Sequence, residues 1–170
     1  MPAPGMYSGV TTDDAMNLAM SAKAVPLYNA VKEFIANEVE PVTEKYFALG
    51  EGRPDRWQYG AGQLEVLEEL KRKARAKGLW NFFLPNAETG EGLSNLDYAY
   101  IAVELGKNPI ASEAMNCSAP DTGNMEVLER VGTPEQKEKW LKPLLAGEIR
   151  SAYAMTEPDV ASSDAKNLEC

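Results

Sequence analysis

Residues 133–147 read TPEQKEKWLKPLLAG and contain the clearest helix signal in the chain. Thr133 is a favourable N-cap, a proline occupies the first helical position, and Gln136 completes a capping box. Pro143 is expected to distort the last turn, and Gly147 is expected to end the helix. The predicted buried face of this helix is Trp140, Leu141, Leu144 and Leu145.

Helical periodicity recurs through most of the chain and predicts an all-α fold of about six helices. The other predicted buried faces are Leu27, Val31, Phe34 and Ile35; Leu64, Leu67, Leu70 and Ala74; Leu96, Ala99, Tyr100 and Val103; and Met125, Leu128 and Val131. Pro41 is expected to kink or end the first helix, Gly78 to cap the second and Ser94 to begin the third. A short helix is expected near 112–116. Residues 51–62, rich in glycine and proline, are expected to form a loop.

The composition excludes several classes of site. The chain has 170 residues, 17 Lys plus Arg against 26 Asp plus Glu, a net charge of −9 and no histidine. Catalytic triads, histidine-containing zinc sites and di-iron bundles are therefore excluded within this chain. Acidic balance argues against nucleic-acid binding. No metal site is expected, because Cys117 and Cys170 match no ligand spacing, and Cys117 is expected to be a small buried residue.

No signal for a membrane or an organelle is found in the sequence. No apolar run approaches the roughly 18–20 residues that a membrane span needs. Residues 1–14 contain no Lys or Arg, unlike a targeting peptide. The protein is therefore expected to be cytoplasmic, with no membrane span.

Two groups of charged residues are candidates for chemistry. Glu104, Glu113 and Glu126 are interpreted as solvated helix faces rather than as one carboxylate site. The basic run 71–77 is a possible site for phosphates of coenzyme A or for nucleic acid, but it equally suits the last turns of a helix, where the macrodipole favours cations.

The most informative segment is 153–164, which reads YAMTEPDVASSD. Backbone N–H groups, hydroxyls and small side chains at a strand-to-loop turn can hold an anionic group or a polar ring edge, although an ordinary polar loop has the same composition. Residues 167–170 resemble the start of a strand with no partner, so the chain is expected to stop inside a domain.

Residues 155–158 and 163–164 of this segment resemble the flavin-binding signature of the acyl-CoA dehydrogenase family. The departures are one extra residue after Pro158, and an Asp-Val pair where the family commonly has Gly-Ala. Residues 116–125 and 132–137 are similar to the branch of the family that contains acyl-CoA dehydrogenases 10 and 11. Residues 1–12 are rich in Pro, Gly and Ser and are expected to form an irregular tail. The resemblance implies an orthogonal helical bundle over 13–149 and the incomplete start of a middle β-domain over 150–170.

The resemblance also implies roles for particular residues. Met155 and Thr156 are carried over as contacts to the pyrimidine and N5 edge of FAD, with Tyr153 at the entrance. Ser162 and Ser163 would approach the FAD phosphates or the thioester end of coenzyme A. Ser163 is the better match to the family's substrate-contacting serine, and the extra residue leaves this choice open by one position.

The implied reaction is α,β-dehydrogenation of an acyl-CoA thioester, and residues 113–125 resemble the part that lines the acyl cavity. The family's catalytic glutamate belongs to a C-terminal domain, so no catalytic residue is assigned here and the chain is predicted to be inactive alone. In the full-length enzyme, an electron-transfer partner and homo-oligomers are expected. The alternatives are a non-catalytic helical interaction module and an acyl-CoA-binding bundle. Exposed apolar surface is expected at Trp80, Phe82, Phe83 and Tyr153.

Overall fold

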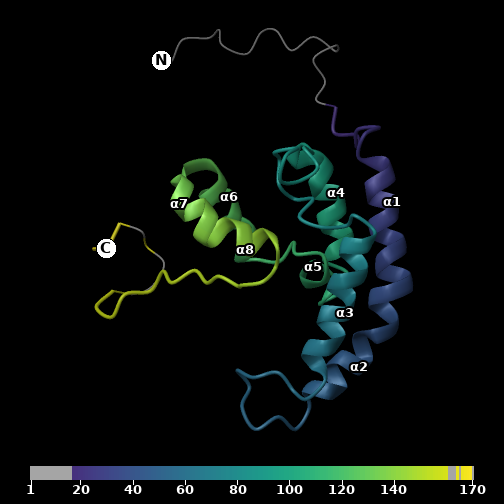
Figure 1. The fold of residues 1–170 in the computed structure, drawn as a ribbon, viewed down its shortest axis with the longest axis horizontal. Coiled ribbons are helices and arrows are strands. Elements are labelled where there is room, and N and C mark those ends of the chain that lie inside the picture. The colour runs from purple at the N-terminus through teal and green to yellow at the C-terminus, as the bar shows by residue number, and fades with distance from the viewer. Residues whose placement is uncertain (1–16, 161–163, 165, 170) are drawn as a thin grey trace, which may run out of the picture.

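The computed structural model describes residues 17–160, 164 and 166–169, and its regular structure is helical (Figure 1). The elements are α1 Val25–Phe34, η2 Ile35–Val39, α2 Glu40–Gly50, α3 Gln63–Ala76, α4 Asn95–Leu105, α5 Ala111–Ala114, α6 Asp121–Val131, α7 Pro134–Gln136, η3 Lys137–Leu141 and α8 Lys142–Leu145. The elements η2 and η3 are π-helical turns that join their neighbours into longer helices. The described ranges contain no strand, which confirms the all-α prediction.

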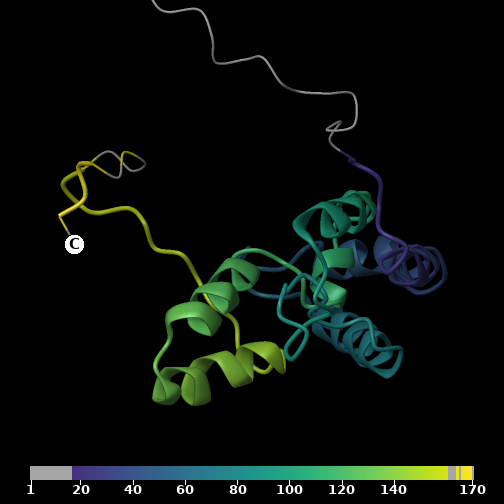
Figure 2. The ribbon, with the colours of Figure 1, turned by 90° about the horizontal axis from the view of Figure 1, so that it is seen from above.

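The helices form two groups (Figures 1 and 2). In the first group, α1, η2 and α2 make one long helix that packs against α4 and α3, with α5 against α3. In the second group, α6 packs against η3 and α8. Residues 150–157 leave this second group without regular secondary structure. Within the described residues, no helix is long and apolar enough to cross a membrane.

Each π turn ends two residues before a proline, Pro41 or Pro143. A proline lacks an N–H group, and its ring would collide with the carbonyl four residues earlier in an α-helix. In both turns, the residue before the proline donates its N–H to the carbonyl five residues earlier: Glu40 to Ile35, and Lys142 to Lys137. Pro143 therefore distorts its helix as predicted. Pro41 does not end its helix, because the wider turn of η2 accommodates the proline ring and the helix continues to Gly50.

Local capping signals are confirmed. The Ser94 hydroxyl accepts the Asp97 N–H at 3.1 Å, and both hydrogen bonds of the Thr133 capping box form. Gly78 and Gly147 have φ angles of +70° and +67° and follow the ends of α3 and α8. The short helix, the stop after α6 and the loop over 51–62 also form where the sequence indicates.

The predicted buried faces are only partly correct. On α1, the predicted residues Val31 and Phe34 are buried. On α3, Leu64 is 46% exposed, and Gln63 is buried in its place. On α4, the predicted face is wrong, because Tyr100 and Val103 are exposed while the opposite face is buried. The buried face of α4 contains Asp97, Ile101, Glu104 and Leu105. Val131 and Trp140 are also exposed, although they were expected in the core.

The charged residues are used within the fold. Glu104 and Glu113 do not lie on a solvated face: Glu104 is buried and accepts from the Tyr28 hydroxyl, and Glu113 binds Lys71 at 3.0 Å. In the basic run, Arg72 binds Glu69 and Lys73 binds Glu38, both within 3 Å. Lys71, Arg72 and Lys73 of the basic run therefore form ion pairs with carboxylates of this chain.

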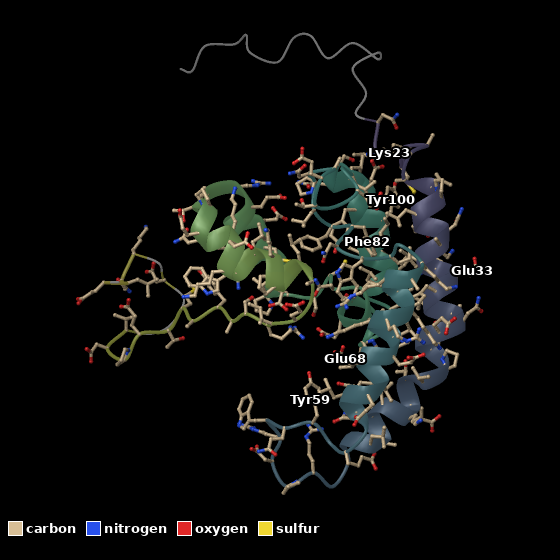
Figure 3. All side chains as sticks on the ribbon, in the orientation of Figure 1. Lys23, Glu33, Tyr59, Glu68, Phe82 and Tyr100 are labelled. Carbon is tan, nitrogen blue, oxygen red and sulfur yellow. The ribbon has the colours of Figure 1, made fainter. Side chains whose placement is uncertain are left out.

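The connector 79–84 between α3 and α4 supplies much of the core. Phe82 is fully buried near the middle of the structure (Figure 3), and Leu79, Phe83 and Leu84 are buried with it. Trp80 is partly buried. The prediction of exposed apolar surface is therefore wrong for Trp80, Phe82 and Phe83. It is confirmed for Tyr153, which is 73% exposed. Cys117 is buried as predicted.

Two asparagines with left-handed backbone connect the two helix groups. Asn81 and Asn116 have φ angles of +54° and +55°, and both side chains are buried. Asn116 Nδ2 donates to Asn81 Oδ1 at 2.7 Å and to the carbonyl of Leu144 at 3.0 Å. Asn81 Nδ2 donates to the carbonyl of Leu145 at 2.8 Å. We call this pair the asparagine junction. It links the connector 79–84, the turn after α5 and the C-terminus of α8.

Replacing Asn116 tests the asparagine junction. Asn116→Ala leaves Asn81 Oδ1 and the Leu144 carbonyl without that donor, and it places an alanine in left-handed backbone. The free energy of unfolding in urea is expected to fall by about 2–4 kcal/mol. Asn116→Gly loses the same hydrogen bonds without the backbone strain, so its loss is expected to be smaller. Equal losses for the two variants would contradict the role of backbone strain.

Asp97 attaches the segment before α1 to α4. Its Oδ1 accepts the Ser21 N–H at 2.7 Å, and its Oδ2 accepts the hydroxyls of Ser21 and Ser94. The Ser21 N–H is the main cause that lowers the pKa of the Asp97 carboxyl, and burial opposes it. A carboxyl whose pKa is lower in the folded state stabilises the fold above its unfolded pKa.

The contribution of Asp97 is therefore expected to disappear in acid. Asp97→Asn is expected to be less stable than the wild type at pH 7, and this difference is expected to shrink as pH falls below about 4, through the folded pKa. Urea unfolding at pH 7, 5 and 3.5 measures it. Glu33→Gln is the control, because Glu33 points outward from α1 (Figure 3). A difference that is constant with pH would refute the assignment.

Candidate functional site

The chain turns out of the second helix group at Gly147. The N–H of Gly147 bonds to the carbonyl of Leu144 and the N–H of Glu148 to that of Pro143, which is a Schellman ending. A Cβ at Gly147 would lie 2.8 Å from the Trp80 ring, so glycine is required by space as well as by its φ angle. This turn directs the following residues back along α6.

Asp121, at the start of α6, holds the chain after this turn. The side chain of Asp121 is 4% exposed. Its Oδ1 accepts the N–H of Ser151 at 2.7 Å and the hydroxyl of Ser151 at 2.6 Å. Its Oδ2 accepts Arg150 Nε at 2.5 Å. Three donors on one buried carboxylate fix both the backbone and the side chains of residues 150 and 151.

Arg150 continues this arrangement toward the first helix group. Its Nη1 lies 2.5 Å from Oε1 of Glu113, and the same oxygen lies 3.0 Å from Nζ of Lys71. Burial of the guanidinium opposes the charged form, but the attraction of Glu113 and Asp121 outweighs it and raises the pKa of Arg150. We call Lys71, Glu113, Arg150 and Asp121 the anchor network. It connects α3, α5 and α6 to the departing chain.

The segment that carries the predicted flavin contacts follows the anchor network directly. Tyr153 and Thr156 are exposed and Met155 is half-buried. In the described part of the chain, the backbone N–H groups of 152–156 donate no hydrogen bond to protein atoms. Ser162 and Ser163 lie outside the described residues. The segment therefore presents extended backbone whose donors are open to another group.

Two hollows lie along α6 beside this segment. One has a volume of about 290 Å³ and is lined by residues of α6, by Trp140 and by 149–152. The other, of about 450 Å³, lies over the N-terminal half of α6 and reaches Tyr153. Asn124 and Val127 line both hollows. A side chain added at Gly123 would meet no atom within 4 Å, so this face of α6 is open.

This arrangement suits binding rather than proton transfer. Open backbone donors and the Thr156 hydroxyl match the polar edge of a planar ring. Glu113 and Asp121, the two carboxylates of the anchor network, are held by cations and by Ser151, so neither is free to act as a base. The residues that could hold a cofactor are thus the predicted Tyr153, Met155 and Thr156.

Sequence reasoning found this segment but missed its anchor. Asp121 follows Pro120 at a helix start, which is a recognisable signal for an N-terminal acidic residue. Arg150 carries no local signal, because its two carboxylate partners lie 29 and 37 residues away in the sequence.

Comparison with known proteins gives consistent matches. The family model described as acyl-CoA dehydrogenase, N-terminal domain, matches residues 22–148. Acyl-CoA dehydrogenase family member 11 of Gallus gallus is 50% identical over 153 residues. FadE2 of Mycobacterium tuberculosis, named as an acyl-CoA dehydrogenase, is 47% identical over 160 residues. A solved structure assigned as an acyl-CoA dehydrogenase, from Mycobacterium abscessus, has a TM-score of 0.79 and 52% identity.

These matches cover most of this chain but only part of each relative. They include 88%, 91% and 88% of this chain, respectively. The chain spans 19% of the Gallus gallus protein, 37% of FadE2 and 38% of the solved chain. The similarity therefore concerns the N-terminal helical domain and the first residues beyond it.

Asp121→Asn tests the anchor network. The amide nitrogen would face the Arg150 Nε–H, donor against donor, so the free energy of unfolding is expected to fall by about 1–3 kcal/mol. The Ser151 amide is expected to exchange its hydrogen faster. Glu126→Gln on the same helix removes an exposed ion pair with Arg130 and is expected to change little. Unchanged exchange at Ser151 would contradict the anchoring role.

Proposed function

Since the chain belongs to the acyl-CoA dehydrogenase family and contains its N-terminal helical domain, we propose that it supplies the first part of an FAD site in an acyl-CoA dehydrogenase. The observation that carries this proposal is the extended segment 152–156, fixed at one end by Asp121 and open along its backbone donors. When bound, FAD supplies the acceptor for hydride in the oxidation of an acyl-CoA thioester.

The residues of this chain act by binding and orienting. The backbone of Met155 and Thr156 would hold the flavin ring, at its pyrimidine and N5 edge. The Thr156 hydroxyl adds a donor that tunes the electronic properties of the ring. Tyr153, beside the hollow over α6, lies at the entrance. Ser162 and Ser163, which lie outside the described residues, are proposed as contacts to the FAD phosphates or the thioester; Ser163 is the better match for the substrate contact, and Ser162 is the alternative.

The open face of α6 borders the acyl part of the substrate. Its hollows are lined by apolar and small groups, among them Val127, Gly123 and Pro120. Such a lining suits a hydrocarbon chain, because burial of apolar surface stabilises the complex by roughly 25 cal/mol per Å². Acyl chain length is set by how the rest of the enzyme closes these hollows.

The catalytic base comes from outside these 170 residues. In the family reaction, a carboxylate removes the α-proton while the β-hydrogen leaves as hydride. Glu113 is bound by Lys71 and Arg150, and Glu104 by Tyr28 and Lys107, so both are committed to structural roles. The whole enzyme is proposed to act as a homo-oligomer with an electron-transfer partner.

The purified 170-residue chain tests this proposal. It is expected to show no flavin absorbance after purification and no reduction of an artificial electron acceptor with acyl-CoA substrates, because the base is missing and the flavin site is incomplete. Turnover by the chain alone would refute the assignment of the base. Calorimetry with an acyl-CoA addresses the alternative, since tight binding without flavin would instead indicate an acyl-CoA-binding bundle.

A further inference from the structure

A second site candidate lies on the loop between α2 and α3, away from segment 152–156. Residues 53–59 read RPDRWQY, and we call them the Arg-Trp loop. A hollow of about 270 Å³ is lined by this loop together with Tyr46 of α2 and Gln63 of α3. Figure 3 shows Tyr59 on the loop, beside the lower end of α3.

The loop is fixed at both ends. Gly60 packs so closely on the end of α2 that a Cβ there would lie 1.9 Å from the carbonyl oxygen of Leu49. The buried Gln63 side chain accepts the Gly60 N–H at 2.8 Å and donates to the Tyr46 carbonyl at 3.0 Å. At the other end, Arg53 Nη1 donates to the carbonyl of Gly50 at 3.0 Å. Anchoring of this kind lowers the entropy lost when a ligand binds.

The tip of the loop is ordered as well. Asp55 Oδ1 accepts the Trp57 N–H at 2.9 Å, which makes an Asx turn. The Arg56 guanidinium lies 4.7 Å from the centre of the Trp57 ring. Trp57 is nevertheless 81% exposed and Tyr59 53% exposed. Two aromatic side chains are therefore held at the surface with more than half of their area open to solvent.

The charge of this hollow is opposite to that of the chain. The chain carries a net charge of −9, yet the described residues that line the hollow include two arginines and no Asp or Glu. Within the described residues, Arg53 and Arg56 take part in no ion pair, whereas Arg72, Arg130 and Arg150 each bind a carboxylate. Unpaired guanidinium groups attract anions with several acceptor oxygens.

The hydroxyls add further donors. Burial is the main cause that raises the pKa of Tyr46, so its hydroxyl stays protonated at neutral pH and can donate. The guanidinium and phenol groups together offer more hydrogen-bond donors than the two oxygens of a carboxylate can accept. Their number suits the three acceptor oxygens of a phosphate group better. The exposed indole offers a surface on which a planar ring stacks.

We propose that the Arg-Trp loop binds a small aromatic phosphate of about the size of a mononucleotide. The phosphate is held by Arg53, Arg56 and the tyrosine hydroxyls, and the ring stacks on Trp57. The volume of the hollow lies just below the range of about 300–1,000 Å³ for drug-sized ligands, which limits the ligand to a small molecule.

The test uses AMP as the probe on the 170-residue chain, followed by NMR at the indole N–H of each tryptophan. AMP is expected to shift the Trp57 signal saturably. Arg53→Gln and Arg56→Gln are each expected to weaken binding about tenfold or more. Arg130→Gln, which removes an exposed arginine elsewhere, is the matched control and is expected to bind AMP as the wild type does.

Two further controls define what would overturn the proposal. Trp140 also has a cation near its ring, with Lys139 Nζ at 4.9 Å, so an equal shift at Trp140 would mean non-specific binding. Adenosine and inorganic phosphate are each expected to bind at least tenfold more weakly than AMP. If either compound binds as well as AMP, the loop is not a site for an aromatic phosphate. The same conclusion follows if Arg53→Gln and Arg56→Gln leave the affinity for AMP unchanged.

Discussion

The structure depends on how the carbonyls at the C-terminus of α8 are satisfied. The last carbonyls of a helix have no partner within the helix, and here they face the interior between the two helix groups. Asn116 donates to Leu144, and Asn81 and the Trp80 indole donate to Leu145. Both asparagines adopt left-handed backbone to reach these oxygens. The strain in the two backbones is offset by hydrogen bonds that would be costly to leave unmade in a buried position.

This junction also sets the direction of the candidate site. Because α8 is held against the connector after α3, Gly147 turns next to Trp80, and residues 150 and 151 reach Asp121. The anchor network then ties the departing chain to α3 and α5 through Glu113 and Lys71. We therefore expect a change in the asparagine junction to shift Thr156 as well, through Gly147 and the contacts of residues 150 and 151 with Asp121.

Local sequence signals predicted helix ends well, whereas burial was predicted less well. Ser94 and Thr133 are caps whose partners lie three residues away, so the sequence alone identifies them. The buried face of α4 was missed because Asp97 and Glu104 look solvent-facing until Ser21 and Tyr28, 76 residues away, supply their partners. The asparagine junction has no local signal. The flavin segment was identified by resemblance, while its anchor depends on contacts between distant residues.

The helical body and segment 152–156 differ in how their polar groups are satisfied. Within the described residues, no buried side-chain polar atom lacks a hydrogen-bond partner. In contrast, the backbone donors of segment 152–156 have no hydrogen-bond partner among the described protein atoms. The helical body therefore satisfies its buried polar side chains with its own residues. What remains open is an extended backbone held rigidly at Asp121, so a strand or a planar ring that adds to it loses little entropy in doing so.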